Sequence, residues 1–312
     1  MKREILGIHH VTAIAGDPQK NLDFYGGVLG LRLVKLTVNF DDPGTYHLYY
    51  GDGAGHPGTI LTFFPWPNAP KGRRGTRQVT ETAFAIPENA VSYWTARLAE
   101  RGIAFEGPAE RFGEQVISVP DPDGLAIELI ATKVVRDDRA WQAGPVPLEF
   151  AIRGFHSATL RESDRAATAG LLTDTMGFHL VGQEGNRYRY AVESGEAANL
   201  VDVLHAPDER FGRVLVGSVH HIAWRTPDDG QQQDWLRELS RLEYGVSPVM
   251  DRKYFHSIYY REPGNILFEI ATDPPGFAVD EEPEKLGTHL VLPPWLESDR
   301  PRIETVLPRL SL

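Results

Sequence analysis

The sequence contains no cysteine among its 312 residues. That absence excludes disulfide bonds, zinc sites built on thiolates and cysteine nucleophiles, and it agrees with a reducing compartment. The sequence also lacks an apolar run long enough to cross a bilayer, and residues 1–4 (MKRE) do not open a signal peptide. We therefore expect a cytoplasmic protein that has no membrane partner.

Positive charge is also scarce. The chain has 32 Lys and Arg against 43 Asp and Glu, a net charge of −11, which argues against nucleic acid or an anionic membrane as a partner. One basic stretch, residues 71–77 (KGRRGTR), departs from this balance, and we interpret it as a solvated linker between modules. The length suits about two domains of ordinary size.

Two kinds of segment occur twice. Residues 24–34 (FYGGVLGLRLV) resemble residues 171–181 (LLTDTMGFHLV), and both predict a helix end, a glycine cap and a strand. Residues 116–132 match residues 257–272, and each reads as a strand, a hairpin turn and a strand. The repeats predict an α+β fold of four βαβββ modules, covering roughly residues 7–65, 79–132, 153–204 and 217–272.

A charged segment with a Gly-Pro-Val-Pro run divides the chain into halves. We expect an N-terminal pair of modules (1–132), a linker (133–150), a C-terminal pair of modules (151–274) and a tail (275–312). Paired modules bury their faces against one another, so four modules should enclose two clefts. The tail is acidic and then proline-rich, and we expect it to cover the surface with short helical turns. A homodimer is compatible with the tail and the fold.

A histidine doublet occurs in two strands at corresponding positions of the repeat. Residues 7–12 read GIHHVT, and residues 218–223 read SVHHIA. The closing strand of the fourth module carries one carboxylate, Glu269, in an apolar run. A buried carboxylate must be paired or metal-bound, because leaving it alone costs several kcal/mol. Two imidazoles and a carboxylate on rigid strands predict a metal site with open coordination positions, and a structural polar cluster is the alternative.

Strand alternation predicts which histidines can reach the carboxylate. Neighbouring side chains of a strand point to opposite faces, so one histidine of each doublet should share a face with Glu269. The alternation does not decide between His9 and His10, or between His220 and His221.

The second and third modules serve as an internal comparison. At the positions of the second histidines they carry Glu81 and Ser157, and Glu128 matches Glu269. We therefore expect no transition metal in the second cleft. We also expect Glu128 and His156 to be structural or exposed to solvent.

These motifs resemble those of the vicinal oxygen chelate superfamily, which includes glyoxalases, bleomycin resistance proteins and extradiol dioxygenases. Within it, the chain looks most like the ring-cleaving dioxygenases that act on hydroquinones. The resemblance covers nearly the whole chain and rests on residues 7–13, 21–25, 29–31, 219–224, 268–272 and 292–296.

The resemblance implies four βαβββ modules around one mononuclear metal ion, Fe(II) or alternatively Mn(II). It implies that the second histidine of each doublet is a ligand, which gives His10, His221 and Glu269. The substrates would be a small aromatic compound and O2.

The resemblance further implies a set of groups around the metal: His9, Thr12, His220, Arg252 and Tyr259. The imidazoles of His9 and His220 can move protons or orient the ligands. Arg252 can hold an anionic intermediate, and Tyr259 can donate a hydrogen bond to a bound oxygen.

Three protein ligands rather than four are expected. A glyoxalase-type isomerase completes its site with a carboxylate from the closing strand of the other module, and here Phe63 is expected at that position. The metal would then keep adjacent positions for a phenol and O2. We therefore expect a ring-cleaving dioxygenase that inserts both atoms of O2 into a hydroquinone-like, or catechol-like, substrate.

Three other functions fit the same motifs. A glyoxalase-type lyase or isomerase would use Zn or Ni and work without oxygen, and the missing fourth ligand counts against it. A resistance protein would bind an aromatic compound without metal. A catechol-type extradiol enzyme would differ in substrate, and Ser157 stands where it usually has a histidine. Four aromatic residues are candidates for the pocket wall or, more commonly, for core packing: Phe63, Trp66, Trp224 and Phe255.

Overall fold

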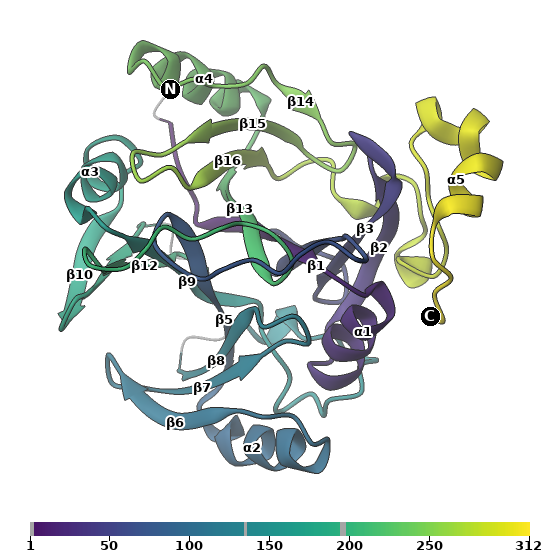
Figure 1. Cartoon of the computed structure of the whole chain (residues 1–312), viewed down its shortest axis with the longest axis horizontal. Helices are drawn as coiled ribbons and strands as arrows, with labels where there is room; N and C mark the ends of the chain where they lie inside the picture. Colours follow the sequence, from purple (N-terminus) through teal and green to yellow (C-terminus); the bar gives the residue numbers. More distant parts are fainter. Residues whose placement is uncertain (1–2, 134–135, 194–197) are drawn as a thin grey trace.

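The computed structural model describes residues 3–133, 136–193 and 198–312. Its strands form two curled eight-stranded sheets (Figure 1). The first sheet has the order β14-β15-β16-β13-β1-β4-β3-β2. Its strands are β1 (Ile8–Ala15), β2 (Arg32–Asn39), β3 (Asp42–Gly51), β4 (Ile60–Pro65), β13 (Ser218–Thr226), β14 (Met250–Asp251), β15 (His256–Arg261) and β16 (Leu267–Thr272).

The second sheet repeats this arrangement with the order β10-β11-β12-β9-β5-β8-β7-β6. Its strands are β5 (Gln78–Pro87), β6 (Glu106–Arg111), β7 (Glu114–Pro120), β8 (Ala126–Thr132), β9 (Phe155–Glu162), β10 (His179–Glu184), β11 (Arg187–Ala191) and β12 (Leu200–His205). The predicted α+β fold of four βαβββ modules is confirmed. The boundaries proposed for the halves and the linker remain a prediction.

Each sheet joins modules from both halves of the chain. Antiparallel strands β1 and β13 pair at the centre of the first sheet and unite the first and fourth modules. Strands β5 and β9 do the same for the second and third modules. The two ends of the polypeptide therefore meet in one sheet, where both histidine doublets lie.

One helix follows the opening strand of each module: α1 (Pro18–Leu22), α2 (Val91–Glu100), α3 (Arg165–Gly170) and α4 (Asp229–Arg241). Side chains of Asp17, Asp164 and Asp228 accept hydrogen bonds from the first turns of α1, α3 and α4, as N-caps do. The predicted glycine caps are confirmed, because Gly30 and Gly177 have φ angles of +72° and +81°.

Helix periodicity places the expected side chains in the core. Trp94 and Leu98 of α2 are fully buried, as are Trp235 and Leu239 of α4. Leu242, which lies just beyond α4, is 37% exposed. Helix α4 packs on β15 and β16, so it covers the strand that carries the site carboxylate (Figure 1).

The tail runs along the β2 edge of the first sheet and contains short 3-10 turns and α5 (Arg300–Val306), as expected (Figure 1). The Lys35 ammonium is completely buried, lies 2.6 Å from Asp280 Oδ1 and also pairs with Glu281. The Val291 amide donates to the Leu36 carbonyl at 2.9 Å. A buried cation paired this way fixes the tail to the sheet, because its separation would leave the charge unpaired.

None of the helices in the described ranges combines the length and the apolar character needed to span a membrane.

Candidate metal centre

A β-bulge lies at the first histidine doublet. In the pairing of β1 with β13, Ile8 lies opposite Trp224 and His10 opposite Ala223. His9 is therefore an extra residue with no partner of its own, which is how a bulge interrupts strand alternation.

A second bulge lies at the other doublet in the same strand pair. Thr12 lies opposite His221, while Ala13 lies opposite Val219. His220 is therefore the extra residue of β13, and each histidine doublet coincides with one bulge.

The bulges bring both rings of each doublet together. The Nδ1 atoms of His9 and His10 lie 2.9 Å apart, and those of His220 and His221 lie 2.8 Å apart. One histidine of each doublet reaches Glu269, as expected. The two rings of a doublet nevertheless remain in contact, which regular strand alternation would not allow. The second histidine of each pair points to Glu269, and the first one contacts its Nδ1.

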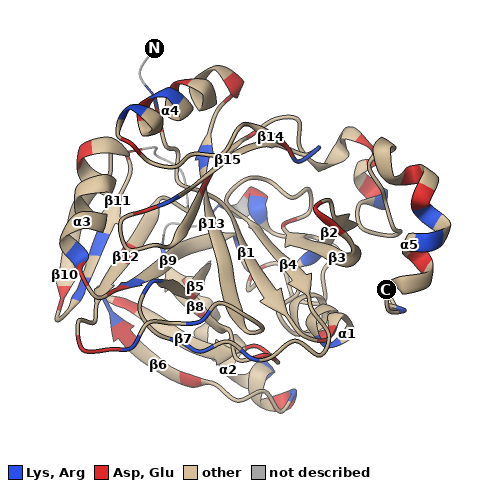
Figure 2. Cartoon of the chain, turned by 45° about the horizontal axis from the view of Figure 1, so that its top comes forward, with Lys and Arg blue, Asp and Glu red and all other residues tan. Residues whose placement is uncertain are grey.

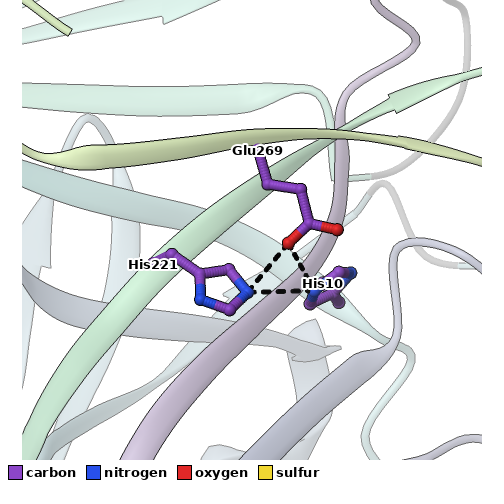
Figure 3. A group of neighbouring side chains, drawn as sticks. All are labelled: His10, His221 and Glu269. Atoms are coloured by element: carbon purple, nitrogen blue, oxygen red, sulfur yellow. Dashed lines mark hydrogen bonds and ion pairs between the residues drawn. The ribbon is translucent and has the colours of Figure 1, made fainter. Parts of the chain in front are cut away.

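Three side chains converge at the centre of the first sheet (Figure 3). The His10 and His221 Nε2 atoms are 3.4 Å apart, and Glu269 Oε2 lies 2.9 Å from His221 Nε2 and 3.4 Å from His10 Nε2. The residues are 2%, 5% and 0% exposed. Within the described ranges, this is the one group of three His, Asp or Glu side chains close enough to share an ion.

A hydrogen-bond chain fixes the tautomer of His10. The Thr272 carbonyl can only accept, so His9 Nε2, at 3.1 Å from it, carries a hydrogen and donates. His9 Nδ1 must then accept the hydrogen of His10 Nδ1. The lone pair of His10 Nε2 therefore faces Glu269. Burial lowers the pKa of His9 well below its ordinary value, which agrees with a neutral ring.

The second doublet has the same contact between Nδ1 atoms, but its first histidine, His220, is less buried than His9. His220 Nδ1 is engaged by His221, and His220 Nε2 has no hydrogen-bond partner in the described part of the chain. Burial, with the neighbouring charge of His221, lowers the pKa of His220 to about 3.

The convergent atoms fit a divalent metal ion. Glu269 Oε2 is buried and accepts no hydrogen bond within the described residues, while Ser257 donates to Oε1 at 2.5 Å. The Nε2 lone pair of His10 thus faces a buried carboxylate oxygen, and a cation between them would stabilise both. Two donors held at about 2.1 Å from one ion lie about 3.0 Å apart at adjacent octahedral positions, about 3.4 Å apart at tetrahedral positions and about 4.2 Å apart when opposite. The observed separations match adjacent positions, so the three ligands would occupy one face of the ion.

A cavity of about 280 Å³ opens beside these three residues. Its wall includes all the predicted neighbours except His9, which lies behind His10. The lining residues are His10, Thr12, Asn39, Phe40, Asp41, His47, Tyr49, Phe64, Trp66, His220, His221, Arg252, Phe255, Tyr259 and Leu267. Of the four candidate aromatic residues, Trp66 and Phe255 line the cavity, whereas Phe63 and Trp224 are fully buried in the core.

Arg252 and Tyr259 form one unit in the cavity wall. Arg252 Nε donates to the Tyr259 hydroxyl at 3.2 Å, and its Nη1 lies 3.0 Å from Asp41 Oδ2. Burial, with the charge of Glu269, raises the pKa of Tyr259 above its ordinary value, although Arg252 opposes this shift. Tyr259 therefore keeps its proton and remains a hydrogen-bond donor.

His47 is a wall residue that the sequence did not reveal. Its ring packs against Tyr49 and Phe64 in tilted arrangements, with ring centroids 3.9 and 4.3 Å away. Its Nε2 contacts Thr62 Oγ1 at 2.8 Å, and Thr62 donates to Thr12 Oγ1 at 3.0 Å. The sequence signal was a single histidine in an aromatic strand, without the doublet or the repeat that identified the others.

The strand register corrects one predicted equivalence. Glu269 pairs with Ala223 on β13, and the corresponding pair in the first module joins Thr12 to Thr62. The expectation that Phe63 occupies this position is wrong by one residue; Phe63 packs on Tyr25 with ring centroids 4.5 Å apart. Thr62 has a hydroxyl and no carboxylate, so the position still lacks the fourth ligand of a glyoxalase-type site.

Arginines fill the corresponding place in the second sheet. Arg111 makes two hydrogen bonds to Glu128, at 2.7 and 2.8 Å, and Glu81 pairs with Arg74 and Arg161. His156 is 6% exposed and lies 3.0 Å from a Glu114 carboxylate oxygen. Glu128 and His156 are therefore structural, one of the two roles expected for them. Strands β1, β4 and β13 of the first sheet are mostly free of charged residues by contrast (Figure 2).

The paired βαβββ modules and the three-residue site define a protein of the vicinal oxygen chelate type. The chain belongs to the Glyoxalase/Bleomycin resistance protein/Dioxygenase superfamily, whose family model matches residues 7–129 and 154–279.

Curated homologous proteins align with nearly the whole chain. The "Putative ring-cleaving dioxygenase MhqO" of Bacillus subtilis is 49% identical, over 97% of this chain and 96% of the relative. The "Chlorohydroquinone/hydroquinone 1,2-dioxygenase" of Sphingobium indicum is 36% identical, over 95% of this chain and 94% of the relative. A crystal structure of a "putative dioxygenase" from Bacillus subtilis superimposes with a TM-score of 0.95 at 48% identity, over 99% of each chain.

Proposed function

We propose that this protein is an Fe(II)-dependent ring-cleaving dioxygenase that inserts both atoms of O2 into a hydroquinone-like aromatic substrate. The arrangement of the metal ligands carries the proposal: His10, His221 and Glu269 would bind one face of an ion, and Thr62 supplies no further carboxylate. Two adjacent coordination positions would then be available for the phenol and O2. The names of the relatives support this reaction class.

The metal would supply Lewis acidity for the phenol and a redox centre for the reaction of the ring with O2. His9 and Ser257 hold the ligands in place, since each hydrogen-bonds an atom of a ligand that does not face the site centre. Their contribution is positional: it keeps the Nε2 lone pair of His10 and the Oε2 atom of Glu269 directed to the same point.

The cavity wall would bind the ring and its oxygens. Phe255 and Trp66 provide apolar surface for an aromatic substrate. The Arg252 guanidinium would attract the oxygen that becomes anionic, and Tyr259 would donate its hydroxyl hydrogen to a neighbouring oxygen. His47 would contact the second hydroxyl of a hydroquinone and thereby orient the ring.

Oxygen uptake tests this proposal. Protein loaded anaerobically with Fe(II) should consume one O2 for each hydroquinone and give a product that contains both atoms of labelled oxygen. Loading with Mn(II), and offering catechol in place of hydroquinone, would settle the metal and the substrate class. His10→Ala should abolish both metal binding and uptake. If protein with a measured full complement of iron consumes no oxygen with hydroquinones or catechols, the proposed function is wrong.

A further inference from the structure

A second cavity, of about 380 Å³, adjoins the metal-site cavity and has no part in the proposed chemistry. Three residues line both: Trp66, His220 and Leu267. The remaining wall comes from both sheets and the segments that connect them, namely Ile14, Arg77, Gln78, Val79, Val214, Leu215, Val219, Arg261, Asn265 and Ile266.

The polar groups of this cavity are mainly hydrogen-bond donors. Arg77 and Arg261 bring two positive charges, and no Asp or Glu is among its described lining residues. His220 adds an imidazole whose Nε2 is unpaired within the described chain. Gln78 is 4% exposed and uses Oε1 to accept from the Gly75 amide, while its amide nitrogen has no partner among the described residues. Such a set suits an anion.

Both arginines are held in position by the protein. The Arg261 Nη1 atom donates to the Asn265 carbonyl at 2.8 Å, which leaves its other N–H groups for a ligand. The Arg77 guanidinium lies 3.7 Å from the centre of the Phe211 ring. Glu162 is an acid that interacts with Arg77, and burial beside Glu262 raises the pKa of Glu162 to about 9. Glu162 therefore holds its proton at neutral pH and does not neutralise Arg77.

We propose that the second cavity is a carboxylate subsite, in which Arg261 and Arg77 bind the anion and the apolar wall accommodates the hydrocarbon attached to it. In a chain of net charge −11, two arginines facing an apolar cavity without a lining acid would attract an anion. The shared wall at His220 and Trp66 connects this subsite with the metal site.

Two sources could supply the carboxylate. One is a carboxylate substituent on the aromatic ring. The other is the ring-cleaved product, and this source rests on the proposed function. Insertion of O2 breaks one ring C–C bond and the O–O bond, and no atom is lost. The carbon that carried the hydroxyl becomes a carboxylic acid, which releases its proton to solvent, and the neighbouring carbon becomes an aldehyde.

Binding to metal-free protein in the absence of oxygen tests the subsite separately from catalysis. The probes are sorbate, an open-chain dienoic acid of six carbons, and its neutral alcohol, 2,4-hexadien-1-ol, with tryptophan fluorescence as the readout. Sorbate should bind about tenfold more tightly than the alcohol, and Arg261→Gln should remove that difference. Arg237→Gln, which removes an exposed arginine from α4, is the matched control and should leave it intact.

Two further measurements show which cavity sorbate occupies and which source supplies the carboxylate. Saturating sorbate should leave the Kd of hydroquinone within about twofold in wild-type protein, because the two would occupy different cavities. A ring substituent as the source predicts that 2,5-dihydroxybenzoate binds more tightly than hydroquinone and loses this advantage in Arg261→Gln. If the ring-cleaved product is the source, Arg261→Gln should weaken the binding of sorbate but not the binding of 2,5-dihydroxybenzoate.

Three results would overturn the subsite. Sorbate and the alcohol could bind equally, sorbate could compete with hydroquinone, or sorbate binding could depend on Arg252 and not on Arg261. None of these results depends on oxygen uptake, so a failure of the proposed dioxygenase activity would be recognised separately.

Discussion

Each histidine proposed as a metal ligand contacts a second histidine beside it. His9 fixes His10 through its Nδ1, and the Thr272 carbonyl fixes His9 in turn. The first histidine of a doublet is thus a positioning residue, and its pKa is lowered by burial so that it stays neutral. When His9 is neutral with its hydrogen on Nε2, its Nδ1 can accept the hydrogen of His10 Nδ1.

His9→Phe tests this dependence at the residue scale. Phenylalanine fills a similar volume but cannot accept the His10 Nδ1 hydrogen, so His10 loses the contact that directs its Nε2. We expect Fe(II) or Mn(II) affinity to fall by about 10- to 100-fold, measured by competition with a chelator. His179→Asn, at an exposed position of β10, is the control. Unchanged affinity in His9→Phe would contradict a positioning role.

His47 makes a different prediction, because it contacts the cavity and not the metal ligands. His47→Phe keeps the aromatic packing against Tyr49 and Phe64 but loses the hydrogen bond to Thr62. We expect the KM for hydroquinone to rise about three- to tenfold, the cost of one neutral hydrogen bond, with the bound iron unchanged. Steady-state oxygen uptake and metal analysis measure the two effects. Loss of iron, or a lower kcat at constant KM, would show that His47 acts otherwise.

The strands explain why the sequence could indicate the three convergent side chains but not their arrangement. The doublets and the carboxylate were visible because they recur at matching positions of the repeat. The bulges at His9 and His220 were not, because an inserted residue leaves no mark in a short apolar run. Parallel register has the same limitation: nothing in residues 59–64 indicates that Thr62, and not Phe63, pairs alongside Thr12.

The second sheet allows a prediction at the scale of elements. Arg111 on β6 reaches Glu128 on β8, which is buried, so removing the arginine leaves a carboxylate without its cation. We expect Arg111→Met to lower the free energy of unfolding by about 3 kcal/mol without changing metal affinity. The double variant Arg111→Met, Glu128→Leu should recover most of the loss. Chemical denaturation measures the stability, and a loss of bound metal would contradict the structural role.

At the scale of the molecule, the repeated modules were predictable and the contacts between distant parts were not. Helix and strand patterns recur locally, so they defined four modules. The ion pairs of Lys35 with the tail, and the second cavity between the sheets, join segments with no shared pattern. Such contacts depend on how the modules pack, which local periodicity does not encode.

Glu162 and Glu262 are two buried acids that interact between the two sheets, and they should make the stability of the fold depend on pH. Glu162 ends β9, and Glu262 directly follows β15; they are 1% and 2% exposed. Thr168 donates to Glu262 at 2.7 Å. Burial and the neighbouring Glu262 raise the pKa of Glu162 to about 9, with Asp164 acting in the same direction and Arg77 against it. The folded protein therefore retains a proton that the unfolded chain releases near pH 4.5.

This difference sets the sign of a pH dependence. Because the folded state binds the extra proton, its stability must fall as the pH rises from about 4.5 to about 9. Glu162→Gln replaces the retained proton with a permanent amide donor and removes this loss. We expect the variant to exceed wild type by a few kcal/mol in unfolding free energy at pH 9 and by much less at pH 5. Urea unfolding across this range, with the exposed Glu100→Gln as control, measures the difference; parallel curves for Glu162→Gln and wild type would exclude a proton held between the sheets.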